Sequence, residues 1–419
     1  APGEMATPGG TNQAGLLLYR GRFKDGVFTW TDQRLFPPWK PKDLLRSPSV
    51  LAAKDGSGRV WIAFSTLLGI CGRTGGSGGQ ISVMRSLDEG KTWEPPVIVS
   101  PDEFTESGEL RPENTSCGSK GAIQILPSLA LGPENELYVT WEQGPDLLSL
   151  EPLALGNTTR IGFARSLDGG KTFEPPQVLT VVNSLREDSP VGYSKPTMND
   201  IPRIAVATGG PHKGRVYVTY TSAVEKAPAQ PWVQLLTSSQ VSLVSSDDQG
   251  KTWSQPVPLA ADVPPQLVKR FWPTPVVRQD GTVDVVYMES LEKQLTPDPG
   301  DIECNIMMVL DWTRAGRFAS LIDVYWVQSA DGGASFGPPV RVSSETTNWC
   351  KVKYDYQTTQ YANFGDVLGV FTTGARTFVV WPDGRNGIPD AYFAELVDYK
   401  AGAAAAAKPA EAGKTSPQM

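Results

Sequence analysis

A short phrase that returns at a nearly constant interval constrains the fold of this chain more than any other feature. It reads RSLDEGKTWEPP at residues 85–96 and RSLDGGKTFEPP at 165–176, with looser copies, SSDDQGKTWSQP and SADGGASFGPP, at 245–256 and 329–339. The first serines of the shared core are spaced by 80, 80 and 83 residues. Self-similarity at a fixed interval is the signature of repeated structural units. The phrase therefore predicts a repeat architecture.

Each copy of the phrase stands in the same surroundings. Two short runs rich in Val, Ile and aromatic residues, bounded by Gly, Pro or Asp, precede it, which is the pattern of β-strands. A third run enters the phrase and a fourth leaves it, so each unit is predicted to be a four-stranded antiparallel meander with the phrase at its last turn. The preceding pairs lie at 47–53 and 59–65, 126–132 and 136–142, 201–207 and 215–221, and 274–279 and 283–289.

These units favour one architecture. A single sheet cannot bury both faces, whereas several sheets arranged around an axis bury each against the next, as in a β-propeller. A fifth unit has runs at 365–371, 377–383 and 391–399, and the segment 16–36 reads as a hairpin that completes this blade and closes the ring. We therefore predict an all-β fold, a β-propeller of four-stranded antiparallel blades with five countable blade repeats and a sixth as the alternative. The predicted boundaries are an N-terminal extension, 1–13, a single propeller, 14–399, and a low-complexity Ala/Pro tail, 400–419.

The phrase itself has a physical explanation. In Ser-x-Asp-x-Gly-x-Thr-Trp, the Ser and Asp side chains can hydrogen-bond the turn backbone, Gly takes a positive φ, and the aromatic residue packs between sheets. The pattern resembles the Asp box, or BNR repeat, of the sialidase-like propellers, over roughly residues 14–399. The resemblance implies a structural role for Ser86, Asp88, Gly90, Trp93, Ser166, Asp168, Gly170, Phe173, Ser246, Asp248, Gly250, Trp253, Ser329, Asp331, Gly333 and Phe336.

Composition excludes several classes of function. The net charge of −7 argues against a general nucleic-acid binder, which needs a basic surface. No run approaches 18 apolar residues, so no transmembrane segment is predicted. Gly-Lys-Thr inside three phrases lacks the earlier glycine of a phosphate-binding loop, and the chain has one histidine and no Cys-x-x-Cys, so we predict no cofactor and no metal site. The opening Ala-Pro-Gly-Glu-Met leads us to expect a secreted or periplasmic protein whose signal peptide has been removed.

The four cysteines follow one rule. Cys71 and Cys117 are 46 residues apart, as are Cys304 and Cys350. In each pair the first cysteine lies between the second and third strands of a blade and the second lies in the loop to the next blade, and these loops share one face of a propeller. Four cysteines allow three connectivities. Their positions favour Cys71–Cys117 and Cys304–Cys350, which would fit an oxidising compartment, with four free thiols as the alternative.

The resemblance also indicates where an active site would lie. In sialidase-like enzymes the pocket is on the face opposite the Asp boxes, with three arginines for a carboxylate, a Tyr–Glu nucleophile pair and an Asp acid/base. Arg46 and Pro48 match the first arginine's Arg-Ile-Pro motif, although Ser47 replaces the Ile. The acid/base Asp should follow the next strand, yet residues 65–80 contain no Asp or Glu. Asp43 is the alternative source of the acid.

Other candidates match no family motif. Arginines in two first strands could face inward, glutamates end two second strands, and late tyrosines could supply a nucleophile or be ordinary loop aromatics. The candidates of these kinds are Arg203, Arg278, Glu142, Glu289, Tyr354 and Tyr356. We expect His212 to be an exposed turn residue, and Asp383 and Arg385 to pair with each other or fix a turn.

The incomplete catalytic set decides the predicted function. We expect an exported, non-catalytic sialidase-like propeller that acts as a binding, accessory or structural subunit, with carbohydrate as a candidate ligand. The alternative is an active exo-glycosidase of sialidase type that hydrolyses terminal sugars. The tail cannot build a core of its own, so we expect a protein partner or a neighbouring copy to order both termini.

Overall fold

The computed structural model describes residues 15–37, 44–67, 79–100, 123–144, 158–185, 190, 192–193, 200–224, 238–260, 268–296, 317–353, 365, 368–397 and 399. The chain divides into two compact units. The first comprises residues 1–131, 135–152 and 162–178, and the second comprises 132–134, 153–161 and 179–419. Within the described residues every regular element is a strand except the short 3-10 turn Trp349–Lys351.

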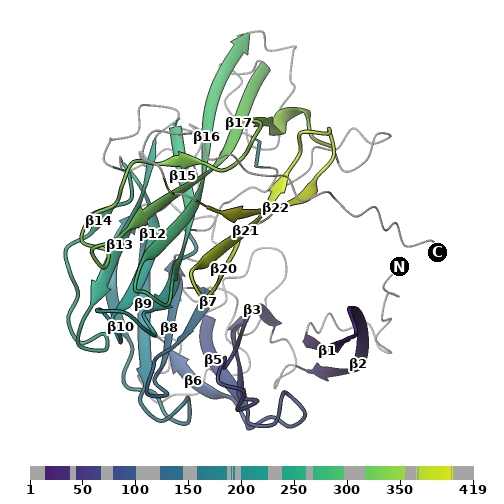
Figure 1. Ribbon diagram of the computed structural model, residues 1–419, viewed down its shortest axis with the longest axis vertical. Coiled ribbons are helices and arrows are strands. Elements are labelled where there is room, and N and C mark those ends of the chain that lie inside the picture. Colours follow the sequence, from purple (N-terminus) through teal and green to yellow (C-terminus); the bar gives the residue numbers. More distant parts are fainter. Residues whose placement is uncertain are drawn as a thin grey trace, which may run out of the picture. The chain divides into compact units, whose positions relative to one another are not determined.

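The N-terminal half of the chain forms three sheets (Figure 1). A hairpin of β1 (Leu16–Lys24) and β2 (Val27–Phe36) is a two-stranded sheet of its own. Two antiparallel meanders of four strands follow it along the chain. They consist of β3 (Leu44–Ala52), β4 (Val60–Leu67), β5 (Gly79–Ser86) and β6 (Val97–Ser100), and then β7 (Ile123–Leu131), β8 (Leu137–Gly144), β9 (Thr158–Ser166) and β10 (Gln177–Asn183).

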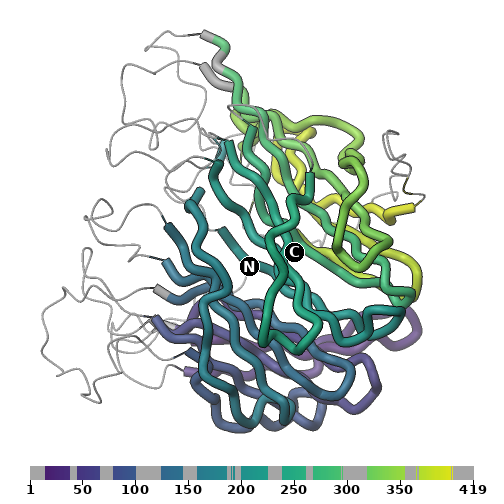
Figure 2. Tube along the Cα trace, turned by 90° about the vertical axis from the view of Figure 1, so that its left-hand side faces the viewer, coloured from purple at the N-terminus to yellow at the C-terminus, as the bar shows by residue number. Residues whose placement is uncertain are grey.

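The second unit contains a nine-stranded sheet and a three-stranded sheet; in Figure 2 the former runs from teal to green and the latter is yellow. The large sheet joins two meanders through one parallel pair, Ser239 opposite Lys269. Its strands are β11 (Arg203–Val206), β12 (Val216–Ala223), β13 (Ser239–Ser246), β14 (Val257–Pro258), β15 (Val268–Val277), β16 (Val283–Thr296), β17 (Arg317–Ser329), β18 (Val340–Arg341) and β19 (Thr347–Asn348). The small sheet consists of β20 (Gly369–Thr373), β21 (Arg376–Asp383) and β22 (Asp390–Leu396).

The all-β, antiparallel prediction is confirmed, and a strand lies at every run that the sequence singled out. Two features differ from simple repeats. The third and fourth meanders are hydrogen-bonded into one sheet, and β16 and β17 extend together as a hairpin of 14 and 13 residues. The fifth sheet has three described strands, and β1–β2 pairs with no other described strand. Ring closure and the number of blades therefore stay predictions.

The sheets bury alternate side chains in compact clusters. In the first unit, Trp61 and Trp141 lie at 1% exposure among aliphatic residues of β4, β5 and β8. The indole Nε1 of Trp61 donates to the carbonyl of Gly169 at 2.9 Å. Gly162 lies directly under Trp141, where a Cβ would stand 2.3 Å from the ring. Strand alternation thus places two tryptophans between neighbouring strands, and one of them requires glycine beneath it.

A second repeat, not noticed in the sequence, lies in or just before the first strand of each of the four meanders. A non-glycine residue with positive φ stands directly before a proline each time, and the strand register shifts at three of these sites. A positive φ is costly for such residues, and proline normally favours an extended neighbour, so the surrounding sheet must hold the conformation. The residues are Ser47, Leu126, Ile201 and Trp272, with φ of 51°, 56°, 37° and 54°.

Candidate functional site

The four repeated turns, residues 86–93, 166–173, 246–253 and 329–336, share one hydrogen-bond pattern. Each serine hydroxyl accepts the amide of the glycine four residues on at 2.7–2.8 Å and donates to the aspartate at 2.7–2.8 Å. Each aspartate also accepts the amide of the following Thr or Ser at 2.8–3.0 Å and its hydroxyl at 2.5–2.7 Å. Each aspartate therefore holds the backbone of its own turn in place.

Their electrostatics agree with that role. Burial opposes ionisation of Asp168 and Asp331, but hydrogen bonds from the turn outweigh it and lower each pKa to about 2. Backbone and side-chain hydrogen bonds from the turn threonine lower the pKa of Asp88 and Asp248 below its usual range as well. Carboxylates held in this way are ionised at neutral pH and have no proton to donate.

The opposite ends of the strands carry four of the sequence-predicted site residues, Arg46, Glu142, Arg203 and Glu289. In the first unit, Arg46 is exposed and lies across from Ser65 in the β3–β4 register. Glu142, near the end of β8, is fully buried across from Ile125. Asp43 and residues 68–78, where a sialidase-type acid would be sought, lie outside the described residues. Arg46 lies on the first strand of its sheet and Glu142 on the second strand of its own, and the two side chains differ in exposure.

Arg203 is the most unusual of the predicted arginines. It opens β11 across from Thr219 and is half-buried. Within the described stretches no hydrogen bond or ion pair reaches its guanidinium, and burial alone lowers its pKa to about 10. A desolvated cation without a counter-charge destabilises the folded protein. Such a charge is often retained because it binds a ligand, so Arg203 is a candidate anion-binding group.

Glu289 has a partner that the sequence did not reveal. It stands opposite Arg270 in the β15–β16 register, and Arg270 Nε donates to its carboxylate at 2.8 Å. Arg270 also reaches the Gln240 side chain at 3.3 Å, and its side chain is 6% exposed. The nearby Tyr325 has its pKa raised to about 12 by burial and by the charges of Glu289 and Asp323, so this phenol stays protonated. Glu289 is therefore held as an ion-paired carboxylate beside a neutral tyrosine.

Arg278 is engaged structurally rather than presented to a ligand. Its Nε donates to Asp284 at 2.6 Å and lies 3.2 Å from Thr377 Oγ1 on β21. Asp284 is completely buried and also accepts bonds from Trp326 Nε1 at 2.8 Å and Gln328 Nε2 at 2.9 Å. This carboxylate ties β16, β17 and β21 together inside the second unit.

A polar cluster at the far end of the long hairpin was missed by sequence reasoning. Ser290 and Ser320 both donate to Glu292 Oε1, the latter at 2.9 Å, and their hydroxyls lie 3.1 Å apart. Lys269, across from Ser290, is also fully buried. The signal that could have found the cluster is the alternation of polar residues, rather than apolar ones, on the inward face of β16.

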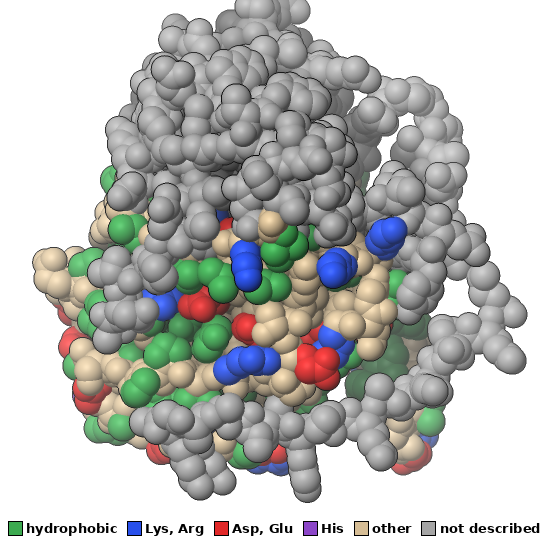
Figure 3. Space-filling model, turned by 90° about the horizontal axis from the view of Figure 1, so that it is seen from above, with side chains coloured by type: hydrophobic (Ala, Val, Ile, Leu, Met, Phe, Trp, Pro, Cys, Tyr) green, Lys and Arg blue, Asp and Glu red, His purple; other side chains and the backbone are tan. Residues whose placement is uncertain are grey.

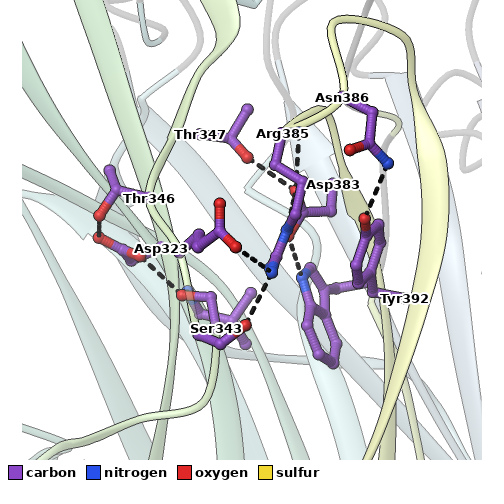
Figure 4. A network of polar contacts seen from close by, with 12 residues as sticks. Asp323, Ser343, Thr346, Thr347, Asp383, Arg385, Asn386 and Tyr392 are labelled. Atoms are coloured by element: carbon purple, nitrogen blue, oxygen red, sulfur yellow. Dashed lines mark hydrogen bonds and ion pairs between the residues drawn. The ribbon is translucent and has the colours of Figure 1, made fainter. Parts of the chain in front are cut away.

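The Trp-Pro-Asp-Gly-Arg segment forms the network in Figure 4. Asp383 accepts Arg385 Nη2 at 2.6 Å, Thr347 Oγ1 at 2.8 Å and Trp381 Nε1 at 3.1 Å. Burial opposes its ionisation, but these bonds keep the pKa of Asp383 below its ordinary value. The guanidinium also stacks 4.3 Å from the Tyr392 ring. The pairing expected for Asp383 and Arg385 is present.

His212 lies against Gly332 of the fourth repeated turn, where a Cβ would stand 2.4 Å from its ring. Cys350 is disulfide-bonded. Tyr354, Tyr356, Cys71, Cys117 and Cys304 lie outside the described residues, so the predicted pairing stays a prediction.

No group of three or more metal-binding side chains occurs within the described stretches, and no helix there has the length and apolarity to cross a membrane. Seen from above, the described part of the surface shows basic and acidic side chains interspersed among apolar ones (Figure 3). That surface therefore has no block of a single charge.

Comparison with known proteins gives only distant likenesses. No family model and no curated protein matches the chain. A protein of unknown function from Dyadobacter fermentans is 15% identical, with 85% of this chain and 79% of that one covered and a TM-score of 0.45. The leech intramolecular trans-sialidase is 13% identical over 84% of this chain and 57% of its own, also with a TM-score of 0.45. The NanB sialidase from Streptococcus pneumoniae is 12% identical over 84% and 59%, with a TM-score of 0.45. The chain spans less than two thirds of both sialidases, and likenesses of this size assign no activity to it.

Proposed function

We propose that this chain is a sialidase-like propeller that binds its target without cleaving it, as a binding, accessory or structural subunit of an extracytoplasmic assembly. The observation that carries the proposal is the state of Glu289. A catalytic carboxylate at a strand end must reach a substrate or its water, whereas Glu289 is neutralised by Arg270. The other candidate carboxylate, Glu142, is completely buried.

The sequence adds to this support. Residues 65–80 contain no Asp or Glu, so the position where the family's acid/base would stand cannot supply one. The aspartates of the four repeated turns are ionised and bonded to their own backbone. The missing acid and the engaged aspartates both support binding rather than hydrolysis.

One observation favours the second candidate, an exo-glycosidase of sialidase type. Arg203 has a desolvated guanidinium without a partner in the described part of the chain. An arginine in that state can bind the carboxylate of a sugar, as the arginines of a sialidase-type site do.

Turnover of a fluorogenic sialoside distinguishes the two candidates. The purified chain is assayed beside Arg203→Met and Glu289→Gln, with Arg376→Met, an exposed arginine paired with Glu395, as the matched control. We expect no turnover above buffer for any of them. Turnover that Arg203→Met abolishes and Arg376→Met preserves would overturn the binding proposal and establish the glycosidase.

We also propose export and the disulfides Cys71–Cys117 and Cys304–Cys350. The disulfide at Cys350 supports an oxidising compartment. Peptide mapping of the unreduced protein should recover these two cross-linked pairs, and any other pairing would contradict the proposal.

A pull-down with and without residues 400–419 tests whether the tail recruits a partner; equal recovery of the partner would count against that role.

A further inference from the structure

The polar cluster towards the far end of the long hairpin is completely covered. Its side chains share one face of β15, β16 and β17, and none of them is more than 1% exposed. They are Lys269, Ser290, Glu292 and Ser320. Lysine and glutamate are seldom fully buried, and removing them from water costs free energy. The segment that lies over this face therefore needs an explanation.

A short turn from elsewhere in the second unit lies on the cluster. We call its residues Pro190, Gly192 and Tyr193 the tip, and the Tyr193 amide closes the turn by donating to the Pro190 carbonyl at 2.8 Å. A Cβ on Gly192 would stand 2.8 Å from Ser320 Cβ and 2.7 Å from Trp349 Cβ. That spacing leaves no room for a side chain, so the Gly192 backbone lies directly on Ser320.

The Tyr193 side chain makes a second contact. It is completely buried, and its ring meets the Trp272 ring edge-on at 6.0 Å between centroids. Trp272 lies on β15, three residues after Lys269. The tip therefore contacts both strands that flank β16 in the sheet, β15 through Tyr193 and β17 through Gly192.

The chain on either side of the tip is fixed by a separate attachment. Asp200 is completely buried, and its carboxylate accepts the Ser184 hydroxyl at 2.7 Å and the Leu185 amide at 2.9 Å. One carboxylate thus joins the point where the chain leaves the sheet to the point where it returns, as at the neck of an Ω-loop. Detaching the tip would leave this neck intact.

The surface beneath the tip limits how firmly it is held. Burying the Tyr193 ring favours the closed position, as burial of any large aromatic group does. Covering Lys269 and Glu292 opposes it, because ionisable groups lose their hydration. A small contact in which two such terms oppose each other is the kind of segment that opens locally while the rest of a protein stays folded.

We propose that the tip is a lid that closes the polar cluster and opens as one turn while β15, β16 and β17 stay folded. Opening exposes Lys269 and Glu292 together with two serine hydroxyls at the end of the strands opposite the repeated turns. The lid does not rest on the proposed function. Turnover of a sialoside would overturn that function and leave the lid standing, since the lid is defined by access to Lys269.

Amine labelling of the full chain, followed by mass spectrometry, tests the lid without any substitution. The labelling rate of Lys269 is measured at several urea concentrations below the unfolding transition, with the exposed Lys213 as internal reference. We expect Lys269 to label more slowly than Lys213, with a urea dependence much weaker than that of global unfolding, because a small opening exposes little surface. Labelling as fast as Lys213, or with the full urea dependence of unfolding, would overturn the proposal.

Two variants test whether the tip is the cover. Tyr193→Ala removes the ring that packs on Trp272, and Gly192→Val places a side chain where Ser320 leaves no room. Each should raise the labelling rate of Lys269 by about tenfold or more, since each removes or blocks a buried contact. An unchanged rate in both variants would show that the tip does not cover the cluster.

Two controls separate opening of the lid from a general loss of stability. Tyr193→Phe keeps the ring against Trp272, so Lys269 should label as in the native chain. Ser246→Ala weakens the third repeated turn, remote from the tip in the sequence, and should also leave labelling of Lys269 unchanged. An increase in Ser246→Ala as large as that in Tyr193→Ala would show that Lys269 is reached only by global unfolding, and the proposal would fail.

Discussion

The two ends of the strands in this molecule are built on different principles. At the end that holds the four repeated turns, one set of hydrogen bonds recurs four times with distances that agree within 0.3 Å. At the opposite end, the candidate site residues share no common environment. Arg46 is exposed, Glu142 is buried, Arg203 lacks a described partner, and Glu289 is paired with Arg270.

This difference distinguishes residues that form the fold in every repeat from residues that can vary between repeats. A turn that must form in every repeat keeps the residues that satisfy its backbone, because an unpaired buried amide costs free energy in each copy. Residues at the other end have no such common task and can diverge. The variable end is therefore where a ligand site is sought, as in other rigid scaffolds whose loops carry function.

The largest effect is expected from Asp284, which lies at the turn end of β16. Asp284→Ala leaves Arg278, whose side chain is 15% exposed, without its counter-charge and should lower the free energy of unfolding by about 3–5 kcal/mol. Asp247→Ala, which removes an exposed partner of Arg215, is the control and should cost less than about 1 kcal/mol. Urea denaturation measures both. Equal small losses would show that burial of the carboxylate does not set what its ion pair contributes at the turn end.

The same contrast can be tested with two arginines. Arg203→Met removes a desolvated, unpaired charge and should leave stability unchanged or raise it by about 1 kcal/mol. Arg278→Met leaves Asp284 unpaired and should lower stability by about 3–5 kcal/mol. Denaturant titration of both variants measures the change in the free energy of unfolding. A large loss for Arg203→Met would show that this residue has a structural role.

Alkaline pH sharpens the test for Arg203. Its folded pKa of about 10 lies below the ordinary 12.5, so the unfolded state binds more protons between these values. This group's contribution to the free energy of unfolding therefore rises with pH across that window. The difference between the native chain and Arg203→Met should shrink as pH rises from 10; a constant difference would argue against desolvation as the cause.

The repeated turns should show smaller and mutually similar effects. Ser246→Ala leaves the buried amide of Gly250 without its acceptor and should cost about 1–3 kcal/mol. Ser245→Ala is the matched control, because its hydroxyl bonds nothing in the described stretches. Thermal melts of the equivalent variants at Ser86, Ser166 and Ser329 should shift alike, and one outlier would show that the turns are not equivalent.

Acid should weaken the turns by the smallest margin. The folded pKa of about 2 for Asp168 and Asp331 lies below the model-peptide value of 3.8. Their contribution is complete above about pH 4 and is lost as pH falls towards 2. Unfolding monitored across this range should show falling stability, with a flatter curve for Ser166→Ala, since the lost hydrogen bond lets the Asp168 pKa return towards 3.8.

Much of the fold followed from the sequence because strand alternation and the repeated phrase are local signals. The pairing of Arg270 with Glu289 did not, because it depends on the register between β15 and β16. The positive φ of Ile201 and Trp272 was also missed, since proline normally keeps its predecessor extended. Among candidate site residues, sequence reasoning found Arg203 and Glu289, but only the structure separated the unpaired cation from the neutralised carboxylate.

The parallel pair of Ser239 and Lys269 has a mechanical consequence. It joins the third and fourth meanders in one sheet, so we expect tension applied along the chain to release them together. In a force experiment the two should yield in a single step of about twice the contour length of one meander. The first meander has no such link among the described strands and should give a shorter step of its own.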